Sequence, residues 1–470
     1  MRLKQLFIWL VVLALAAAAY FISGETERRA QEAKDKADRL VKLEESAKVQ
    51  RVELSGEQYP RPVMIERREK EHSWRILKPV DYPGDGLNIG RLIDAVLAAR
   101  IKKRLQGPVK LADFGLKPPQ VRLVLVPDKG EKVALIFGEV SPTKTHLYAA
   151  PADADGKDGI WMIPAKVRDD IVQTLFQLRD KLVLDFVIND VVRIEMDTGK
   201  GHFVLVRKKS GDDTKWRFAD GTEADPEEVD TLLSRIHGLM AKDFVDSGID
   251  MKKMGLEPAA GVVKLELDDK GKKTTIGLLV GAKAKTGDER YVRRSSGGPV
   301  MVVNQTSLAA IQMSRHRLTQ RRPWRLERKK IVSIAIDRRK DGQKLVYVQN
   351  DDQWRRTQPP GGENSGTPAS LFVWDLIDLK WEKILPPGGD YGLDHPQVVI
   401  TITQRKGKAQ GDKPAQTVKY RLLVGKKDPK SGLLAAQVQG QKRVLGIKPK
   451  FLENVPKLEK KKKQSAPKGD

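Results

Sequence analysis

A cluster of arginines around one tryptophan is the group of residues in this sequence best suited to binding a ligand. Trp324 follows a proline and stands among five basic side chains, Arg315, Arg317, Arg321, Arg322 and Arg325. Guanidinium groups bind phosphate through paired hydrogen bonds, and an indole ring beside them can stack on a base. The pattern indicates a candidate interaction patch for a polyanion. A solvated basic linker is the alternative, and the simpler, interpretation.

Three aspartates, Asp153, Asp155 and Asp158, resemble part of a calcium loop, because hard cations prefer several carboxylates at short spacing. The glycine of such a loop is at the wrong position and no glutamate closes it, so we expect a polar hairpin tip. The six histidines are scattered, and His237 and His395 are expected to be packing or surface residues. The sequence predicts no metal site and no cofactor.

Motifs for known catalytic mechanisms are missing from the chain. It has no cysteine, which excludes disulfides, thiolate catalysis and cysteine-based metal sites. It also has no H-E-x-x-H, no G-x-S-x-G and no P-loop sequence. We therefore predict no catalytic residues, and the alternative left open is an active site confined to one diverged part of the chain.

The elements that carry these residues repeat with a period of about 140 residues. Each copy has a tryptophan that opens a short strand, an aromatic or Met residue followed by Gly-Leu, and a glycine that closes an apolar strand. The tryptophans are Trp74, Trp216 and Trp354, the Gly-Leu glycines are Gly115, Gly255 and Gly392, and the closing glycines are Gly138, Gly281 and Gly425. Three anchors recurring in one order indicate that a unit was triplicated. Since the shared residues are packing and turn residues, the copies repeat a framework and share no catalytic group.

Length and pattern predict an α+β protein with an N-terminal transmembrane helix and a polar stalk, followed by three tandem repeats of mixed strands with two helices each. At 470 residues the chain is long enough for three domains. The expected parts are a membrane anchor at 1–24, a polar helical stalk at 25–48, repeats at 49–186, 187–326 and 327–456, and a basic disordered tail at 457–470.

Within a repeat, the order predicted is strands, helix, strands, helix. In the first copy a helix is expected over residues 88–105, where Leu92, Val96 and Ala99 form one apolar stripe, and a closing helix over Ala165–Leu178 after a proline. In the third copy the central helix is expected over Ala369–Trp381, and the segment 449–454 is too short for a full closing helix.

The segment Leu6–Ile22 carries no charge and would span roughly 25 Å as a helix, at the short end for crossing a bilayer. Its alanines offer a site for cleavage as a signal peptide, which is the alternative. The apolar run continues past them to Ile22, which favours a retained anchor.

Arg2 and Lys4 precede this segment and favour a cytoplasmic N-terminus, whereas six basic residues between Arg28 and Lys42 oppose it. We favour an extracytoplasmic body. The net charge of +25 predicts attraction to polyanions. Outside the cytoplasm these would be anionic lipid or a cell-wall polymer, and no nucleic acid is expected.

The order of the Trp anchor, a helix, the Gly-Leu-x-Pro motif at Gly115, the closing glycine strand and a helix ending at Leu178-Arg179-Asp180 resembles the DUF4340 family. The resemblance covers most of residues 49–455. Two departures are that the third copy lacks the arginine of the closing helix and that Met254 replaces the aromatic residue of the second copy. The family is bacterial, its members typically carry one N-terminal membrane helix, and their genes often neighbour those of gliding-type ABC transporters.

The resemblance implies an envelope role associated with a transporter, and the family has no established enzymatic activity. We therefore expect a single-pass protein of the bacterial inner membrane that acts as a non-enzymatic scaffold or binding subunit. Its expected partners are the lipid bilayer, through the N-terminal helix, and the permease or auxiliary subunits of an ABC-type transporter. The alternative is an envelope protein that binds an anionic lipid or a cell-wall polymer.

Overall fold

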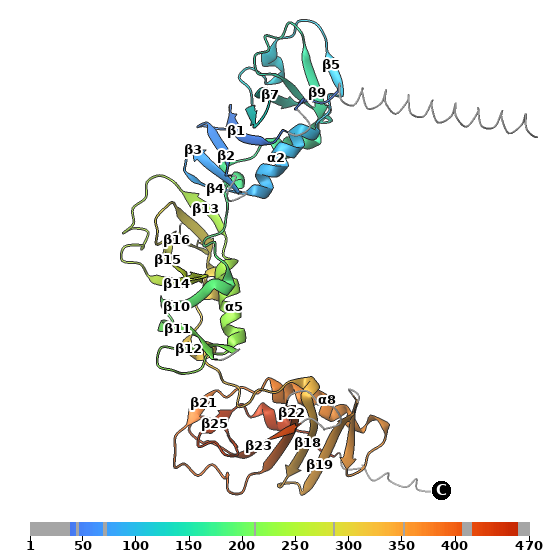
Figure 1. Ribbon diagram of the computed structural model, residues 1–470, viewed down its shortest axis with the longest axis vertical. Helices are drawn as coiled ribbons and strands as arrows, with labels where there is room; N and C mark the ends of the chain where they lie inside the picture. The colour runs from blue at the N-terminus through green and yellow to red at the C-terminus, as the bar shows by residue number, and fades with distance from the viewer. Residues whose placement is uncertain are drawn as a thin grey trace, which may run out of the picture. The chain divides into compact units, whose positions relative to one another are not determined.

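The computed structural model of the chain describes residues 38–43, 47–68, 73–210, 213–284, 287–350, 353–406 and 416–458. Within these ranges the strands form three antiparallel sheets of nine, eight and eight strands, one in each expected repeat (Figure 1). The chain divides into two compact units. One comprises residues 1–222 and 227–317, which include most of the first two repeats, and the other comprises residues 318–470 together with 223–226.

The first repeat begins with a hairpin and two further short strands, followed by the central helix and a second group of strands. Its elements are β1 (Val49–Ser55), β2 (Val63–Arg68), β3 (Ser73–Lys78), β4 (Tyr82–Gly84), α2 (Gly86–Ala98), β5 (Lys103–Leu105), η2 (Leu111–Phe114), β6 (Val121–Pro127), β7 (Val133–Val140), β8 (His146–Pro151), β9 (Ile160–Pro164), η3 (Ala165–Val167), α3 (Arg168–Ile171) and α4 (Leu175–Leu178).

The second repeat keeps this order. Its elements are η4 (Ile188–Asp190), β10 (Val191–Thr198), β11 (Gly201–Ser210), β12 (Asp213–Phe218), α5 (Pro226–His237), β13 (Ala241–Val245), β14 (Gly261–Asp269), β15 (Lys272–Lys283), β16 (Glu289–Arg294), β17 (Val300–Asn304), α6 (Gln305–Ile311) and α7 (Arg315–Leu318).

The third repeat ends with one short helix after its last strand. Its elements are η5 (Arg328–Lys330), β18 (Ile331–Arg338), β19 (Gln343–Asn350), β20 (Gln353–Gln358), η6 (Glu363–Gly366), α8 (Thr367–Ile377), β21 (Lys383–Leu385), β22 (Val398–Lys406), β23 (Gln416–Lys427), β24 (Leu434–Val438), β25 (Val444–Ile447) and α9 (Lys450–Asn454).

Apart from β4, an additional edge strand of the first repeat, the three sheets have the same topology. The first strand of each repeat pairs with its hairpin partner on one side and with the strand that follows the Gly-Leu motif on the other, as β10 does with β11 and β14. The short strand that follows the central helix pairs with the last strand at the opposite edge, as β13 does with β17. The helix therefore carries the chain from one end of the sheet to the other, and it buries its apolar stripe against the sheet on the way.

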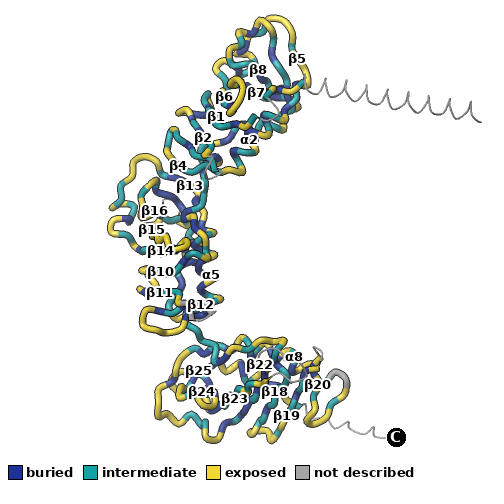
Figure 2. The backbone as a smooth tube through the Cα atoms, viewed as in Figure 1, coloured by how far each residue is buried: buried dark blue, intermediate teal, exposed yellow. Residues whose placement is uncertain are grey.

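The main core of each repeat lies between the central helix and the sheet. In the first repeat Ile89, Leu92 and Val96 of α2 belong to one buried cluster with Ile65 and Phe137 of the sheet. In Figure 2 the buried residues follow the strands and the helix, while the exposed residues lie at the loops. The predicted 3.6-residue stripe is confirmed at Leu92 and Val96, which are buried in α2, whereas Ala99 is buried just after the helix ends.

The repeated glycines are explained by a close approach of two backbone segments. Gly255 has a φ of +64°, in the left-handed region that favours glycine. Gly281 packs against the residue that precedes Gly255, so closely that a Cβ added to Gly281 would be 2.4 Å from the carbonyl oxygen of Met254. The corresponding distance is 2.1 Å at Gly138 and at Gly425. The two glycine anchors of each copy thus form one packing contact.

The tertiary structure differs from the sequence prediction at the helix ends. The helix expected over 88–105 ends at Ala98, and residues 103–105 form β5 instead. The helix expected over Ala369–Trp381 is Thr367–Ile377. The closing helix expected over Ala165–Leu178 is broken into η3, α3 and α4, because Thr174 begins a new helix with a capping box.

The N-terminal predictions fall mostly outside the described residues. The apolar segment 6–22 and the stalk up to residue 37 lie there, as do residues 459–470 of the tail. Within the described ranges no helix is long and apolar enough to span a membrane. Residues 38–43, which were expected to be part of a polar helix, instead lie against the first repeat: Leu40 and Val41 are buried in its core, and the amide of Leu40 donates to the carbonyl of Ala99 at 3.0 Å.

Candidate functional site

The two N-terminal arginines of the predicted patch lie on α7 and are paired within their own unit. Arg315 is 2.5 Å from a carboxylate oxygen of Asp220 and lies over the ring of Phe218, 4.2 Å from its centre. Arg317 donates to Glu228 at 2.9 Å. The pKa of Asp220 is lowered by hydrogen bonds from the amide and hydroxyl of Thr222 and by Arg315. Both arginines therefore connect α7 to neighbouring elements.

The next two arginines of the patch belong to the second compact unit. Arg321 is largely buried, and its Nη1 donates to the carbonyl of Trp381 at 3.2 Å and to the carboxylate of Glu382 at 3.3 Å. Arg322 lies 4.0 Å from the buried carboxylate of Asp225. Each guanidinium thus has an acidic neighbour inside the protein.

The tryptophan of the patch is a core residue. The indole of Trp324 is buried, donates to the carbonyl of Leu376 at 2.8 Å and lies 6.2 Å from the ring of Tyr420. It therefore cannot stack on a base. Arg325 is exposed. The structure brings Arg321, Arg322 and Trp324 together around the end of α8 as packing and ion-pairing residues.

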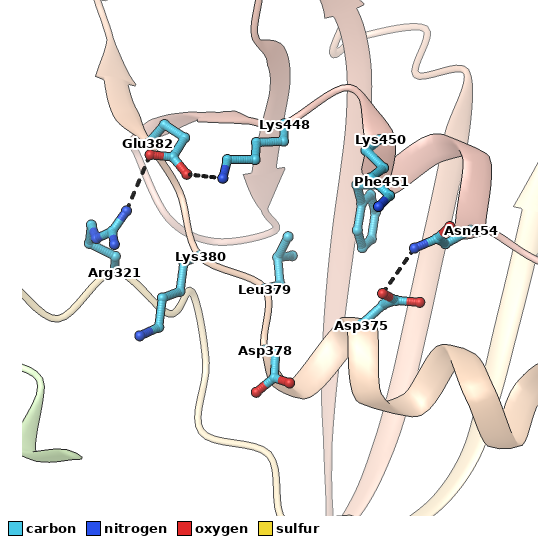
Figure 3. Close-up of a pocket in the computed structure, with 10 residues that line it drawn as sticks. All are labelled: Arg321, Asp375, Asp378, Leu379, Lys380, Glu382, Lys448, Lys450, Phe451 and Asn454. Atoms are coloured by element: carbon cyan, nitrogen blue, oxygen red, sulfur yellow. Dashed lines mark hydrogen bonds and ion pairs between the residues drawn. The ribbon is translucent and has the colours of Figure 1, made fainter. Parts of the chain in front are cut away.

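A pocket of about 400 Å³ opens beside Arg321 (Figure 3). Its wall is formed by the end of α8, the start of β21 and the segment that leads from β25 into α9. The lining residues are Arg321, Asp375, Asp378, Leu379, Lys380, Glu382, Lys448, Lys450, Phe451 and Asn454.

Two carboxylates of this pocket are held by fixed partners. Glu382 is held between Arg321, at 3.3 Å, and Lys448, at 3.4 Å. Asp375 accepts a hydrogen bond from the amide of Asn454 at 3.0 Å. Figure 3 shows the group around Glu382 on one side of the pocket and the pair of Asp375 and Asn454 on the other, with Leu379 and Phe451 between the two groups. Fixed cations beside fixed carboxylates suit recognition of polar groups on a ligand or a partner.

The other acidic candidates serve local structure. Asp155 accepts from the amide of Lys157 at 2.9 Å and pairs with its ammonium group at 2.8 Å, as expected for a polar turn. Across the described parts of the chain, no group of three or more His, Asp or Glu side chains is placed to hold a metal ion.

Two linkers join the repeats, one from the end of α4 to η4 and one from the end of α7 to η5. Each linker starts with the same bond to the preceding repeat. The amide of Asp85, the N-cap of α2, donates to the carbonyl of Leu178 at 2.8 Å. The equivalent bond joins Asp225 to Leu318, also at 2.8 Å. The linkers then bind the residues that follow the next central helix, where the amide of Ala241 donates to Lys181 at 2.8 Å.

The first linker contains an interaction that the sequence analysis missed. Arg179 is 2% exposed and its guanidinium lies beside a pair of aromatic rings, 5.9 Å from the centre of Tyr82 and 4.7 Å from that of Phe244. It donates to Asp246 at 2.8 Å. Tyr82 belongs to the first repeat, whereas Phe244 and Asp246 belong to the second. The sequence contained one sign of this interaction. Arg179 follows Leu178 at the end of the first repeat, whereas the equivalent residue of the second repeat is Thr319.

A second arginine completes this junction. Arg294 of β16 lies over the ring of Tyr82, 5.2 Å from its centre, and donates to the carbonyls of Leu182 and Val183 at 2.8 and 2.7 Å. Burial raises the pKa of the Tyr82 hydroxyl and also that of Asp180. The first two repeats are thereby joined by a buried set of cations and rings, which agrees with their forming one compact unit.

The fold and these linkers define a class of protein: a tandem array of one antiparallel sheet-and-helix unit. The chain matches the family described as "Domain of unknown function (DUF4340)" over residues 74–259 and 216–388, and it belongs to that family. Each match begins at an anchor tryptophan, Trp74 or Trp216, and runs through a linker into the next copy. No curated protein and no solved structure matches the chain.

Proposed function

We propose that this chain is a non-enzymatic scaffold or binding subunit of the bacterial cell envelope. The observation that carries the proposal is the repetition of a framework: the glycine contact and the linker contacts recur between copies, as at Gly138 and Gly281. Multiplying a rigid block extends a binding surface without adding a reactive group.

The pocket of the third repeat supports a role in recognition. Its carboxylates are held by cations and an amide at short distances, as Glu382 is by Arg321 and Lys448. A carboxylate held in this way is fixed in place, which favours contact with a polar partner.

The partner that we propose is a subunit of an ABC-type transporter, with the chain anchored in the inner membrane by the apolar segment 6–22 and the repeats outside the cytoplasm. This part of the proposal comes from the family resemblance and from the charge-free N-terminal segment.

Photo-crosslinking in native membranes tests the proposal. The full chain would carry a photoreactive residue at Lys450, exposed at the mouth of the pocket, or at Lys273, exposed on β15, as the matched control. We expect a covalent adduct with a membrane transport protein from position 450 and a weaker one from position 273. Equal labelling from both positions, or adducts with lipid alone, would contradict a specific protein partner at the pocket.

A further inference from the structure

The outward face of α8 differs in chemistry from the same face in the other two repeats. Leu371 and Trp374 lie one turn apart on this helix and are 67% and 50% exposed. The amides of Ile101, Ala241 and Trp381 donate to the carbonyls of Asp38, Lys181 and Arg321, and these equivalent bonds align the three central helices. In that alignment the equivalent positions are Arg91 and Asp94 in α2 and Thr231 and Ser234 in α5. Only the third of these helices has a large apolar pair where the others are polar.

A cation lies against this apolar pair, and further cations lie close to it in the chain. The guanidinium carbon of Arg328 lies 5.0 Å from the centre of the Trp374 ring, which places η5 beside α8. Arg325 and Lys329, on either side of Arg328 in the chain, are exposed. The acid nearest to them in sequence, Glu327, pairs with Lys330 at 2.7 Å.

The end of β22 adds one more cation, Lys406, which alternation along the strand places on the same side of the sheet as the core residues Ile400 and Ile402. The side chain of Gln404 accepts from the amide of Glu327 at 2.8 Å and donates to the carbonyl of Arg325 at 3.4 Å. The strand therefore ends against η5. The next residues are Arg405 and Lys406, and both are exposed.

The second repeat has acids at several of these positions. Ile331 pairs with Gln404 as Val191 pairs with Leu267, so the two sheets are in the same register here. In that register Arg405 and Lys406 take the places of Asp268 and Asp269. Arg325 likewise takes the place of Asp185. The third repeat therefore has basic residues where the second repeat has acidic ones, and it also exposes Leu371 and Trp374.

We propose that this face, formed by Leu371, Trp374, Arg325, Arg328 and Lys406, docks onto the surface of an anionic phospholipid bilayer. Cations bind the headgroup phosphates, while an indole and a leucine enter the interfacial region below them. A soluble polyanion would use the cations and gain nothing from Leu371. The face belongs to the third repeat alone, so the inference does not depend on a transporter partner.

The absence of cysteine from the chain makes a site-specific test direct. The full chain would be reconstituted into bilayers of phosphatidylcholine with about one third phosphatidylglycerol, carrying a fluorescent label at Leu371→Cys or at the control Thr231→Cys. We expect a lipid-borne quencher to quench the label at 371 and not at 231. The quenching should be lost in pure phosphatidylcholine.

Two variants separate the bilayer from other anionic partners. In the Leu371→Cys background, Arg328→Glu with Lys329→Glu should weaken docking by roughly fivefold or more for each charge changed. Trp374→Ser should weaken it as well, because the ring enters the interface. A water-exposed label at 371 in anionic bilayers would overturn the proposal. So would displacement by soluble polyphosphate combined with full docking of Trp374→Ser, since that outcome identifies a simple polyanion site.

Discussion

The guanidinium of Arg179 lies 4.7 Å from the centre of the Phe244 ring, on the opposite side of the boundary between the first two repeats. The same group pairs with Asp246, whose side chain is 35% exposed. A buried cation held by rings and one carboxylate is costly to leave unpaired and has few other positions available. It therefore sets how these two repeats meet.

Replacing Arg179 by alanine should destabilise this junction by about 2–4 kcal/mol, somewhat reduced because the remaining Asp246 is partly solvated. Hydrogen exchange at the amides of Val183 and Ala241, which bind across the linker, is the measurement. Arg317→Ala, which removes an exposed ion pair on α7, is the control and should cost less than about 1 kcal/mol. Equal exchange in the two variants would show that Arg179 does not hold the junction.

The glycine contact predicts a sharp difference between two glycine substitutions in the second repeat. Gly281→Ala would place a Cβ 2.4 Å from the carbonyl oxygen of Met254, so the strand must shift. We expect a loss of about 1–3 kcal/mol. Gly199→Ala, with no atom within 4 Å of the added carbon, should change stability little. The midpoint of urea unfolding, followed by the fluorescence of the buried Trp216, measures both.

The N-cap of α2 predicts a pH dependence. Partial burial alone would raise the pKa of Asp85, but hydrogen bonds from Lys181 and from the amides of Asn88 and Leu87 lower it overall. A lowered pKa contributes stability above the unfolded value, about 3.9, that is lost as the pH falls through the folded value.

Unfolding midpoints measured from neutral pH down to about pH 3 should therefore fall at the acid end. The Asp85→Asn variant should start lower and show a smaller fall, because its cap does not titrate. An unchanged slope in Asp85→Asn would mean that other carboxylates cause the acid loss.

The pocket of the third repeat predicts a role for Glu382 in positioning two cations. Glu382→Gln removes the carboxylate shared by Arg321 and Lys448. We expect faster hydrogen exchange at the amide of residue 382, which donates to Gly446 at 2.8 Å, and a cost of about 1–3 kcal/mol. Glu453→Gln, at an exposed position of α9, is the matched control. Similar exchange in both variants would contradict the bridging role.

Local pattern was sufficient for most strands of each repeat and insufficient for the strand after each central helix. The alternation of Val191–Met196 and the stripe of α5 are properties of neighbouring residues, and both elements appear in the structure. β13 and its equivalents are short and pair with a strand about 60 residues away. Nothing in their own sequence specifies that partner.

The arginine cluster shows the same limit for a candidate site. Arg325 is exposed, but Arg321 is paired and Trp324 is packed in the core, because the chain places the end of α8 beside them. Composition alone cannot tell an arginine that faces solvent from one that faces a carboxylate.

The sequence by itself determined the triplication, the family and the order of elements, because these depend on residue types at regular spacing. The tertiary structure decided which charges are paired, how Arg179 joins two repeats and where Trp374 becomes exposed beside Arg328. Those outcomes depend on contacts between residues far apart in the chain, and burial and charge pairing exist only once the sheets and helices have packed.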